Sequence, residues 1–577
     1  MTQEPKTAEL GQGLPPTDIH AVSVSLPKWR DTVGWATKDP QVLAHLKTGY
    51  PRFYIHPFVE RLATLLLQLS VKTKSVASSI GEIYGGESRA AAAAMLFPHA
   101  ILGISCRDYL QRVRSNPSNK DAIFTFQMDF AGEVRNVHSG IAKSTSEAFQ
   151  SLCIVVFPHY LSREAKAFWQ HTGFGVTSRH ALYWLERAPC LREVVASIRQ
   201  DAKLPLDDAK QAATKIRNRI SELLSSESST VRAQDVFLYP SGMSAIAHSA
   251  SALQELYKGS ANSIRVAVFG FLYVDTFKVL GKVKQIECVL YGHASPADMD
   301  QLEQDLQDGM EIHALYTEFP GNPLLGSLDL ERLYKLSQSF HFHVIVDDTV
   351  GTAVNLDLAP FCDVLCTSLT KMFSGACNVM GGSLTICPGS ESKSALHSTL
   401  TRQYSDTYFP LDLLVMAQNS KDFAERVHVA NGNAEAIAAK LRDHPIVDRV
   451  FYPRGSATQH LYDGYRRRRP RAREDEDGND QAQAGYGYLL SIRFVKDSAA
   501  IAFHDALDVA KGPSLGTNFT LCCPYTLLAH ASELEWASEF GVVEHLVRLS
   551  VGIERREELE ETVDRALEAA AKAAQAE

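Results

Sequence analysis

Lys371 stands in a short polar stretch whose composition could support chemistry. The stretch 367-TSLTKMFSG-375 places hydroxyl side chains before the lysine and a glycine after it, directly behind an apolar segment. A lysine in such a loop is most often a solvated side chain. The alternative is a lysine held near a phosphate, where it binds the phosphate or forms a Schiff base with a carbonyl group. For this stretch alone, a solvated loop lysine is the favoured interpretation.

A second candidate is the turn 239-YPSGMSAI-246, which follows a predicted strand and opens a predicted helix. Gly242 lets the chain turn tightly, so that the backbone N–H groups of Gly242 and Met243 can point at an anion. The dipole of the helix favours negative charge at the same place. Many ordinary strand–helix turns contain Ser-Gly, so this indication is weak by itself.

Two further polar residues come at the ends of apolar runs. Asp347 ends the run in 343-HVIVDD-348, where a carboxylate either caps the next helix or projects desolvated into a site; we weigh these interpretations equally. Asn322 precedes a proline in 318-EFPGNP-323, and a turn-forming role is the ordinary interpretation there.

The elements that must position these residues alternate in type after residue 230. Short apolar runs are separated by helical patterns, which predicts βαβ units and a mainly parallel sheet. Ligands of such sheets gather at the carboxyl ends of the strands. The runs are DVFLYP, IRVAVFG, IECVLYG, IHALYTEF, HVIVDD, DVLCTSL and GGSLTIC.

One edge of this sheet therefore collects an anion-binding turn, a carboxylate, an amide and a lysine. Pyridoxal 5'-phosphate requires that set, because it has a phosphate, a ring nitrogen that must stay protonated, a phenolic oxygen and an aldehyde that condenses with lysine. The combination is far more specific than any of its members, and it predicts this cofactor.

The rest of the chain suggests a division into four parts. We expect a disordered tail at 1–20, a mostly helical region at 21–230, the cofactor-binding domain at 231–409 and a smaller α+β domain at 410–577. Within the second part, SRAAAAAMLFPHAILG has the apolar spacing of a helix, whereas CIVVFPHY resembles a buried strand. The second part could also be a separate interaction module.

Composition excludes several classes of function. The 577 residues carry 58 basic and 67 acidic side chains, a net charge of −9, which argues against a nucleic-acid-binding protein. No apolar run is long enough for a membrane helix, and the first residues lack the pattern of a targeting peptide. Ten scattered cysteines without CxxC pairs indicate reduced thiols and a cytoplasmic protein.

The segment 465–487 contains RRRRPRAR followed by EDED. It could be a localisation signal or an anion-binding patch, but a solvated loop with balanced charge is strongly favoured.

Several motifs together resemble the pyridoxal-phosphate enzymes of cysteine and methionine metabolism, most of all the fungal cystathionine γ-synthases. They occur in the family's order over roughly residues 231–570, and a looser match, 49-GYPRFYIHP-57, lies upstream. The resemblance implies an α/β protein of fold type I, with a large domain around a mainly parallel sheet, a smaller C-terminal domain and a helical N-terminal extension. The motifs are LYPSGMSAI, TEFPGNPLL, VIVDDTVG, TSLTKMFSGACNVMGGSL, KGPSLGTNFTLCCPYTLLAHASELEWA and LVRLSVGIE.

The resemblance implies roles for particular residues. Lys371 would bind the cofactor aldehyde and move protons, Asp347 would pair with the ring nitrogen, and Asn322 would bond the phenolic oxygen. Tyr273 would stack on the ring. The phosphate would be bound by Gly242, Met243, Ser368 and Thr370.

Substrate and subunit contacts are implied in the same way. Arg548 would hold the substrate carboxylate, with Ser514 at the same end. Tyr50 and Arg52 would belong to an arm near 49–57 that reaches the phosphate of a neighbouring subunit, which implies a homodimer or homotetramer with shared active sites.

The sequence also departs from the family pattern. Gly321 and Gly326 replace a serine and an arginine, Ala376 replaces an acidic residue, and Val274 and Asp275 stand where many relatives have two glycines. The cofactor set is retained, and the substrate is left open. We expect γ-replacement on an O-acyl-L-homoserine by L-cysteine, with sulfide or a carbon nucleophile as the alternative and a catalytically silent regulator as a remote one.

Overall fold

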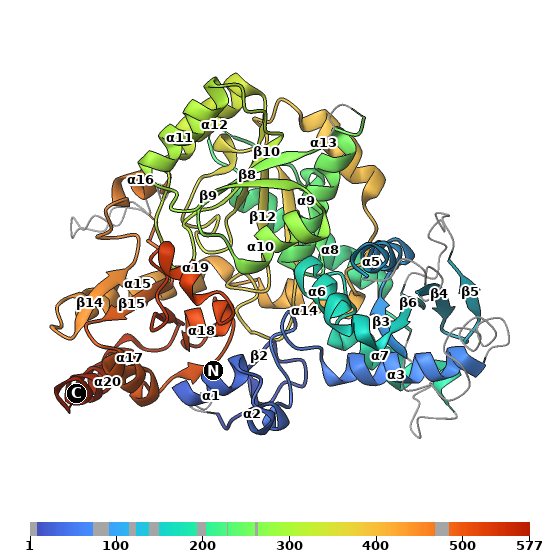
Figure 1. Cartoon of the computed structure of the whole chain (residues 1–577), viewed down its shortest axis with the longest axis horizontal. Helices are drawn as coiled ribbons and strands as arrows, with labels where there is room; N and C mark the ends of the chain where they lie inside the picture. Colours follow the sequence, from blue (N-terminus) through green and yellow to red (C-terminus); the bar gives the residue numbers. More distant parts are fainter. Residues whose placement is uncertain are drawn as a thin grey trace.

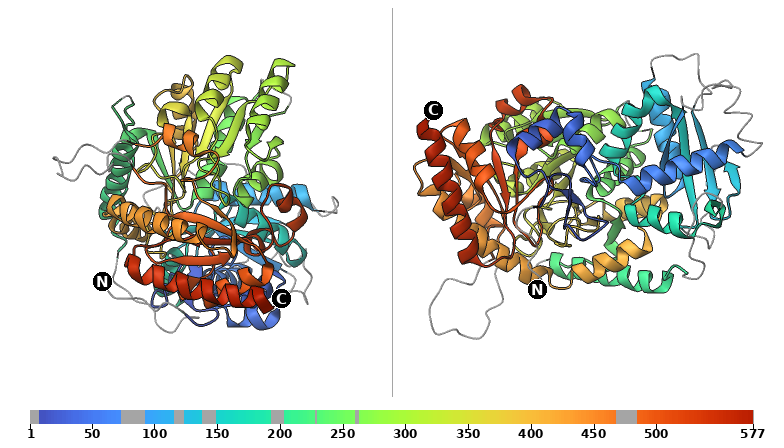
Figure 2. Two further views of the ribbon diagram at one scale, coloured as in Figure 1. Left: turned by 90° about the vertical axis from the view of Figure 1, so that its left-hand side faces the viewer. Right: turned by 90° about the horizontal axis from the view of Figure 1, so that it is seen from below.

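The computed structural model describes residues 8–72, 92–114, 123–137, 149–192, 203–227, 229–259, 263–467 and 484–576. Figure 1 shows a central domain, with a sheet-containing N-terminal region on one side and a smaller C-terminal domain on the other. The view from below in Figure 2 separates the same three parts along the longest axis.

The central domain is built around a seven-stranded sheet of order β7-β13-β12-β11-β10-β8-β9. Only β13 runs antiparallel to its neighbours; the other pairs are parallel. The expectation of an α/β fold with a mainly parallel sheet is confirmed. The strands are β7 (Val236–Tyr239), β8 (Arg265–Phe269), β9 (Glu287–Tyr291), β10 (Ala314–Glu318), β11 (His343–Asp347), β12 (Val364–Thr367) and β13 (Gly382–Ile386).

Helices cover both faces of this sheet because the strands are apolar on both sides. On one face, α9 packs against β7, β12 and β13, and α13 packs on α9. The opposite face shares its core with α8 and with the C-terminal domain. The helices are α8 (Leu206–Leu224), α9 (Gly242–Leu256), α10 (Val274–Lys278), α11 (Pro296–Gln307), α12 (Leu330–Phe340) and α13 (Lys393–Gln403).

The C-terminal domain has a five-stranded sheet of order β14-β15-β18-β17-β16, with α17 packed on α20. Its strands are β14 (Val447–Phe451), β15 (Leu489–Phe494), β16 (Ala510–Lys511), β17 (Leu521–Pro524) and β18 (Val547–Ser550). Its helices, with α14 and α15 leading into it, are α14 (Pro410–Asn419), α15 (Phe423–Arg442), α16 (Gln459–Gly464), α17 (Asp497–Ala506), α18 (Tyr525–His530), α19 (Leu534–Glu539) and α20 (Arg556–Ala576). The charged segment RRRRPRAR lies almost wholly outside the described residues.

The N-terminal region contains an antiparallel sheet, β3-β6-β4-β5, that we did not expect. The prediction of a helix at SRAAAAAMLFPHAILG is wrong for residues 92–97, which form β3, whereas the strand predicted at CIVVFPHY is confirmed as β6. Its strands are β3 (Ala92–Phe97), β4 (Phe124–Asp129), β5 (Val134–Asn136) and β6 (Ser151–Pro158), and its helices are α3 (Pro57–Lys72), α5 (Ala100–Val113), α6 (Ser162–Thr172) and α7 (Ser178–Arg187).

The alanine run explains this error. Alanine favours helices, but residues 92–97 form β3 because they pair along their whole length with β6, the buried central strand. The helical spacing that we predicted begins only at α5. Tertiary pairing thus overrides the local preference of the run.

The first residues are also more ordered than we expected. Residues 13–14 (β1) pair with 23–24 (β2), and Leu14 is buried, so the prediction of a disordered tail is wrong for 8–20. Residues 1–7 lie outside the described residues. Two short helices, α1 (Trp29–Ala36) and α2 (Pro40–His45), follow β2.

The N-terminal region shares a hydrophobic core with the central domain. Phe168 on α6 and Phe157 on β6 belong to the same buried cluster as Met243 and Ile246 on α9. The region therefore packs as an integral part of the molecule.

We expect Phe168→Ala to lower the free energy of unfolding by about 3–5 kcal/mol, because it opens a cavity in this shared core. Urea unfolding of the purified protein measures the change. Arg163→Ala, an exposed position on the same helix, is the control and should stay within about 0.5 kcal/mol. Equal stabilities of the two variants would contradict a shared core.

Candidate active site

A cavity at the carboxyl edge of the central sheet contains every residue that we predicted for the site. It holds about 900 Å³ of space between side chains, part of it open to solvent. The predicted residues along its wall are Tyr50, Arg52, Gly242, Met243, Tyr273, Asn322, Asp347, Ser368, Thr370, Lys371, Ser514 and Arg548. The cavity thus brings together residues from the N-terminal segment, the central domain and the C-terminal domain.

Lys371 is buried in the turn that follows β12. Its Nζ donates to the hydroxyl oxygen of Tyr50 at 3.0 Å and to that of Ser514 at 2.9 Å. It also lies 4.5 Å from the centre of the Tyr50 ring. The amine is therefore aimed by neutral hydroxyl groups, which fix its position while leaving it able to react.

The turn into α9 and the turn after β12 touch closely. A Cβ atom on Gly242 would lie 2.7 Å from the Cβ of Ser368, so only glycine fits between them. Ser241 caps α9 by accepting from the N–H of Ser244 at 3.1 Å. The Thr370 hydroxyl donates to the Gly381 carbonyl at 3.2 Å and accepts from the Gly381 N–H at 3.1 Å. Phosphate binding by Ser368 and Thr370 remains a prediction.

Two carboxylates meet at the ends of β10 and β11. Glu318 and Asp347 are directly paired in the sheet, and both line the cavity. Burial and then the charge of Asp347 raise the pKa of Glu318 to about 8. Burial also raises the pKa of Asp347, whereas the Thr349 N–H at 2.9 Å and the nearby Lys371 oppose that shift.

Glu318 was missed by the sequence interpretation, although it opens the EFPGNP motif. Its carboxylate accepts from the backbone N–H of Tyr273 at 2.5 Å and from that of Asn322 at 3.1 Å. It therefore ties together two loops of the cavity wall. With a proton on Glu318, Asp347 is left as the carboxylate that can face a positively charged ring nitrogen.

Arg548 lies on β18 and reaches the cavity from the C-terminal domain. Its Nη1 donates to Asn322 Oδ1 at 3.0 Å, and its Nη2 donates to the Ser514 carbonyl at 2.7 Å. Tyr525, which the sequence interpretation also missed, contacts both Arg548 and Asn322. Its ring lies 4.6 Å from the Arg548 guanidinium, and its hydroxyl accepts from Asn322 Nδ2 at 3.2 Å. Asn322 is thereby held in one orientation.

Tyr50 and Arg52 line the cavity in the single chain that the structure describes. An arm that reaches the phosphate of a neighbouring subunit stays a prediction. Backbone bonds from Val22 to Cys377 (2.8 Å) and from Leu26 to Lys511 (2.9 Å) fasten the preceding segment to the same chain. The following helix α3 leads into the N-terminal sheet, which packs on α9 through the shared core.

The residues present fit pyridoxal phosphate. Arg52 Nε is buried without a hydrogen-bond partner beside the turn into α9, as an anion-binding group would be. Asp347 has no cationic partner within ion-pair distance among the described residues. An anion at one end and a protonated ring nitrogen at the other would satisfy both groups.

The raised pKa of Glu318 predicts a pH dependence of stability. Folding moves this pKa from 4.5 to about 8, so the folded chain holds the proton more tightly than the unfolded chain. This stabilising contribution is complete below about pH 4.5, shrinks as pH rises, and is lost above about pH 8. We expect Glu318→Gln to flatten this part of the curve for cofactor-free protein in urea unfolding from pH 5 to pH 9. An unchanged pH profile in the variant would show that Glu318 titrates normally.

Comparison with known proteins identifies the family. The profile of the Cys/Met metabolism PLP-dependent enzymes matches residues 213–568, and that of the fungal trans-sulfuration enzyme N-terminal domain matches 72–177. The chain is 33% identical to a cystathionine gamma-synthase of Neurospora crassa, over 97% of this chain and 98% of the relative. It is 36% identical to the cystathionine gamma-synthase-like protein ankD of Aspergillus thermomutatus, over 97% of this chain and 94% of the relative.

A solved structure supports the fold. The cystathionine gamma synthase of Xanthomonas oryzae, in complex with cystathionine, is 22% identical, covers 66% of this chain and 90% of its own, and has a TM-score of 0.51. Among the described residues, no helix has the length and apolar character needed to cross a membrane. The chain belongs to the Cys/Met metabolism PLP-dependent enzymes and is a cystathionine γ-synthase-like enzyme with the fungal trans-sulfuration N-terminal domain.

Proposed function

We propose that the enzyme replaces the γ-acyloxy group of an O-acyl-L-homoserine, acetyl or succinyl, with the sulfur of L-cysteine to give L-cystathionine. The observation that carries this proposal is the position of Lys371 Nζ, 2.9 Å from the Ser514 hydroxyl, while the Ser514 carbonyl accepts from Arg548. A substrate carboxylate on Arg548 would place its α-carbon beside this amine.

Several residues of the cavity have a task in this proposed reaction. Arg548 binds the substrate carboxylate by its guanidinium fork, and Asn322 and Tyr525 keep that fork in place. Tyr273 lies along the cavity wall, where its ring can pack on a flat ligand, and its hydroxyl is buried without a partner. When bound, pyridoxal phosphate supplies an aldehyde that condenses with amines and a ring that accepts electrons.

Lys371 moves the protons, and Tyr50 orients it. In our proposal, Lys371 Nζ takes the proton from the substrate α-carbon and passes it on to the bound cofactor, so that the neutral amine can take a second proton from the β-carbon. The γ-acyloxy group then leaves as a carboxylate anion. The cysteine thiol loses its proton as its sulfur bonds to the γ-carbon, and protons return to the β- and α-carbons. The Tyr50 hydroxyl, 3.0 Å from Nζ, orients the amine between these positions.

Assembly with another copy of the chain is a further part of the proposal. A homodimer or homotetramer with shared active sites, in the cytoplasm, remains our proposal and is supported by the resemblance.

A second candidate is the same γ-elimination followed by attack of sulfide or a carbon nucleophile. The glycines at 321 and 326, in the loop that carries Asn322, favour it: a Cβ at Gly326 would meet open space, and one at Gly321 would meet only a carbonyl at 3.9 Å. The loop that carries Asn322 is therefore less filled than in the family pattern, which has a serine and an arginine at these two positions.

Lys371→Ala should lower the turnover rate by about 10²- to 10⁴-fold or more, because no other amine lines the cavity among the described residues. Borohydride reduction and peptide mass spectrometry should find the reduced cofactor on the Lys371 peptide of the unaltered enzyme. Lys335→Ala, on the exposed face of α12, is the control and should behave as wild type. Undiminished turnover in Lys371→Ala would rule out the assigned role.

The identity of the products distinguishes the two candidate reactions. O-acetyl- and O-succinyl-L-homoserine are each incubated with L-cysteine, sulfide or a β-keto acid, and the products are identified by mass spectrometry. We expect cystathionine from cysteine as the main product. If cysteine yields nothing while another nucleophile is consumed, the second candidate replaces the first.

A further inference from the structure

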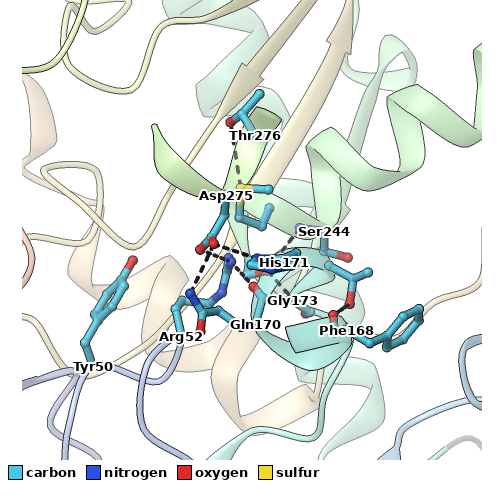
Figure 3. Close-up of polar contacts among 12 residues, drawn as sticks. Tyr50, Arg52, Phe168, Gln170, His171, Gly173, Ser244, Asp275 and Thr276 are labelled. Atoms are coloured by element: carbon cyan, nitrogen blue, oxygen red, sulfur yellow. Dashed lines mark hydrogen bonds and ion pairs between the residues drawn. The ribbon is translucent and has the colours of Figure 1, made fainter. Parts of the chain in front are cut away.

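Asp275 is a fully buried carboxylate beside the cavity and has no role in the proposed reaction. It lies on α10, two residues after Tyr273, and is 0% exposed. His171 Nδ1 donates to it at 2.7 Å, and Gln170 Nε2 donates to it at 3.1 Å. Arg52 Nη2 also donates to it at 3.0 Å. Figure 3 shows these groups converging on the Asp275 carboxylate.

Asp275 is also one of the positions at which the sequence departs from the family pattern. Val274 and Asp275 stand where many relatives have two glycines, which carry no side chain. A carboxylate buried there needs hydrogen-bond donors, because an unpaired buried charge is costly. His171 and Gln170 supply them from the last turn of α6, within the stretch that matches the fungal trans-sulfuration N-terminal domain. The added domain therefore supplies what this departure requires.

Asp275 fixes the first turn of α10, which begins directly after Tyr273. The half-buried side chain of Tyr273 lines the cavity. The backbone N–H of Tyr273 donates to Glu318 at 2.5 Å, which ties this residue to the end of β10. The bonds to Asp275 tie the following turn to the end of α6. Tyr273 is therefore held between two buried carboxyl groups, one on each side in the sequence.

The end of α6 is held in place by contacts other than those of His171. Phe168 lies in the core shared with the central domain, and Gly173 ends the helix with a φ of +65°. The Ser241 hydroxyl donates to the Gly173 carbonyl at 3.3 Å. Removal of the His171 ring therefore takes away a bond to Asp275 and leaves the helix where it is.

The charge on Asp275 strengthens the bonds that it accepts. Burial raises the pKa of Asp275, but the bond from His171 and the charge of Arg52 outweigh burial and hold this pKa below its usual value. The side chain is therefore ionised at neutral pH. Hydrogen bonds to an ionised acceptor are roughly twice as strong as bonds between neutral groups.

We propose that Asp275, held by His171 and Gln170, is a positioning residue that sets where the Tyr273 ring packs on the ring of pyridoxal phosphate. The two bonds from α6 reach Asp275 whichever chain supplies Arg52. This arrangement gives the fungal N-terminal domain a part in holding the flat face of the cofactor, for any acyl group and any nucleophile.

Two ligands separate effects on the ring from effects on the phosphate. Cofactor-free protein is titrated with pyridoxal phosphate and with pyridoxal, and both dissociation constants are determined by absorbance. Tyr273 would meet the ring that both ligands share, so His171→Ala should weaken both by the same factor, about threefold to tenfold. A loss confined to pyridoxal phosphate would place the effect at the phosphate and overturn the proposal.

A double-mutant cycle tests whether His171 acts through Tyr273. Tyr273→Ala removes the stacked ring, so it should weaken both ligands at least as much as His171→Ala does. In the double variant, His171→Ala should add less than about twofold, because the residue that it helps to position is already gone. Losses that multiply would show that His171 affects cofactor binding by another route, against the proposal.

Two milder variants keep the test independent of a folding defect. His171→Asn, whose amide nitrogen can take the place of Nδ1, should restore the binding of both ligands. Gln170→Ala, at a half-buried position, should weaken both ligands in the same direction by a smaller factor. Urea unfolding checks that each variant is folded under the titration conditions. If His171→Asn binds no more tightly than His171→Ala, the hydrogen bond to Asp275 has no positioning role.

His504→Ala is the matched control. His504 is also a buried histidine, and its Nδ1 lies 3.0 Å from the Asp505 carboxylate, but it belongs to α17 and does not line the cavity. Its loss should reduce stability and leave both dissociation constants within about twofold of wild type. A weakening equal to that of His171→Ala would indicate a general effect of lost stability and overturn the proposal. No homoserine substrate enters these titrations, so a wrong assignment of the nucleophile would leave them unaffected.

Discussion

The carboxyl ends of the central strands meet at a single edge of the sheet, and the site depends on this constraint. β10, β11 and β12 run parallel, so the loops that follow them carry Asn322, Asp347 and Lys371 to one place. The sheet topology therefore sets where these groups lie, and the remaining parts of the protein close the cavity around them.

The same edge creates an electrostatic problem. Because Glu318 and Asp347 are neighbours in the sheet, a second negative charge there would be buried beside the first. The proton on Glu318 resolves this conflict and lets that side chain serve as a structural tie between the loops of Tyr273 and Asn322. The Glu318 carboxyl group, which keeps its proton at neutral pH, thus helps to keep Asp347 ionised.

How much the sequence could predict depends on how far apart the interacting residues lie along the chain. Lys371, Asp347 and the Gly242 turn are recognisable because strand, loop and chemistry lie within a few residues of each other. The N-terminal sheet was missed because an alanine run favours helix and only pairing with β6 makes it a strand. Nothing in the local pattern pairs Asp275 with His171, which is 104 residues away, or places Tyr50 against a lysine 321 residues further on.

The buried ion pair between Arg52 and Asp275 has a consequence for how the protein matures. Arg52 and Asp275 are separated by 223 residues, and their contact also requires α6 to be in place. Contacts that span such long stretches of chain close late, because the entropy of the intervening loops must be overcome first. The central sheet can form while the arginine is still absent from it. The cavity is therefore complete only once the N-terminal segments have docked, so the final shape of the site depends on the contacts that close last.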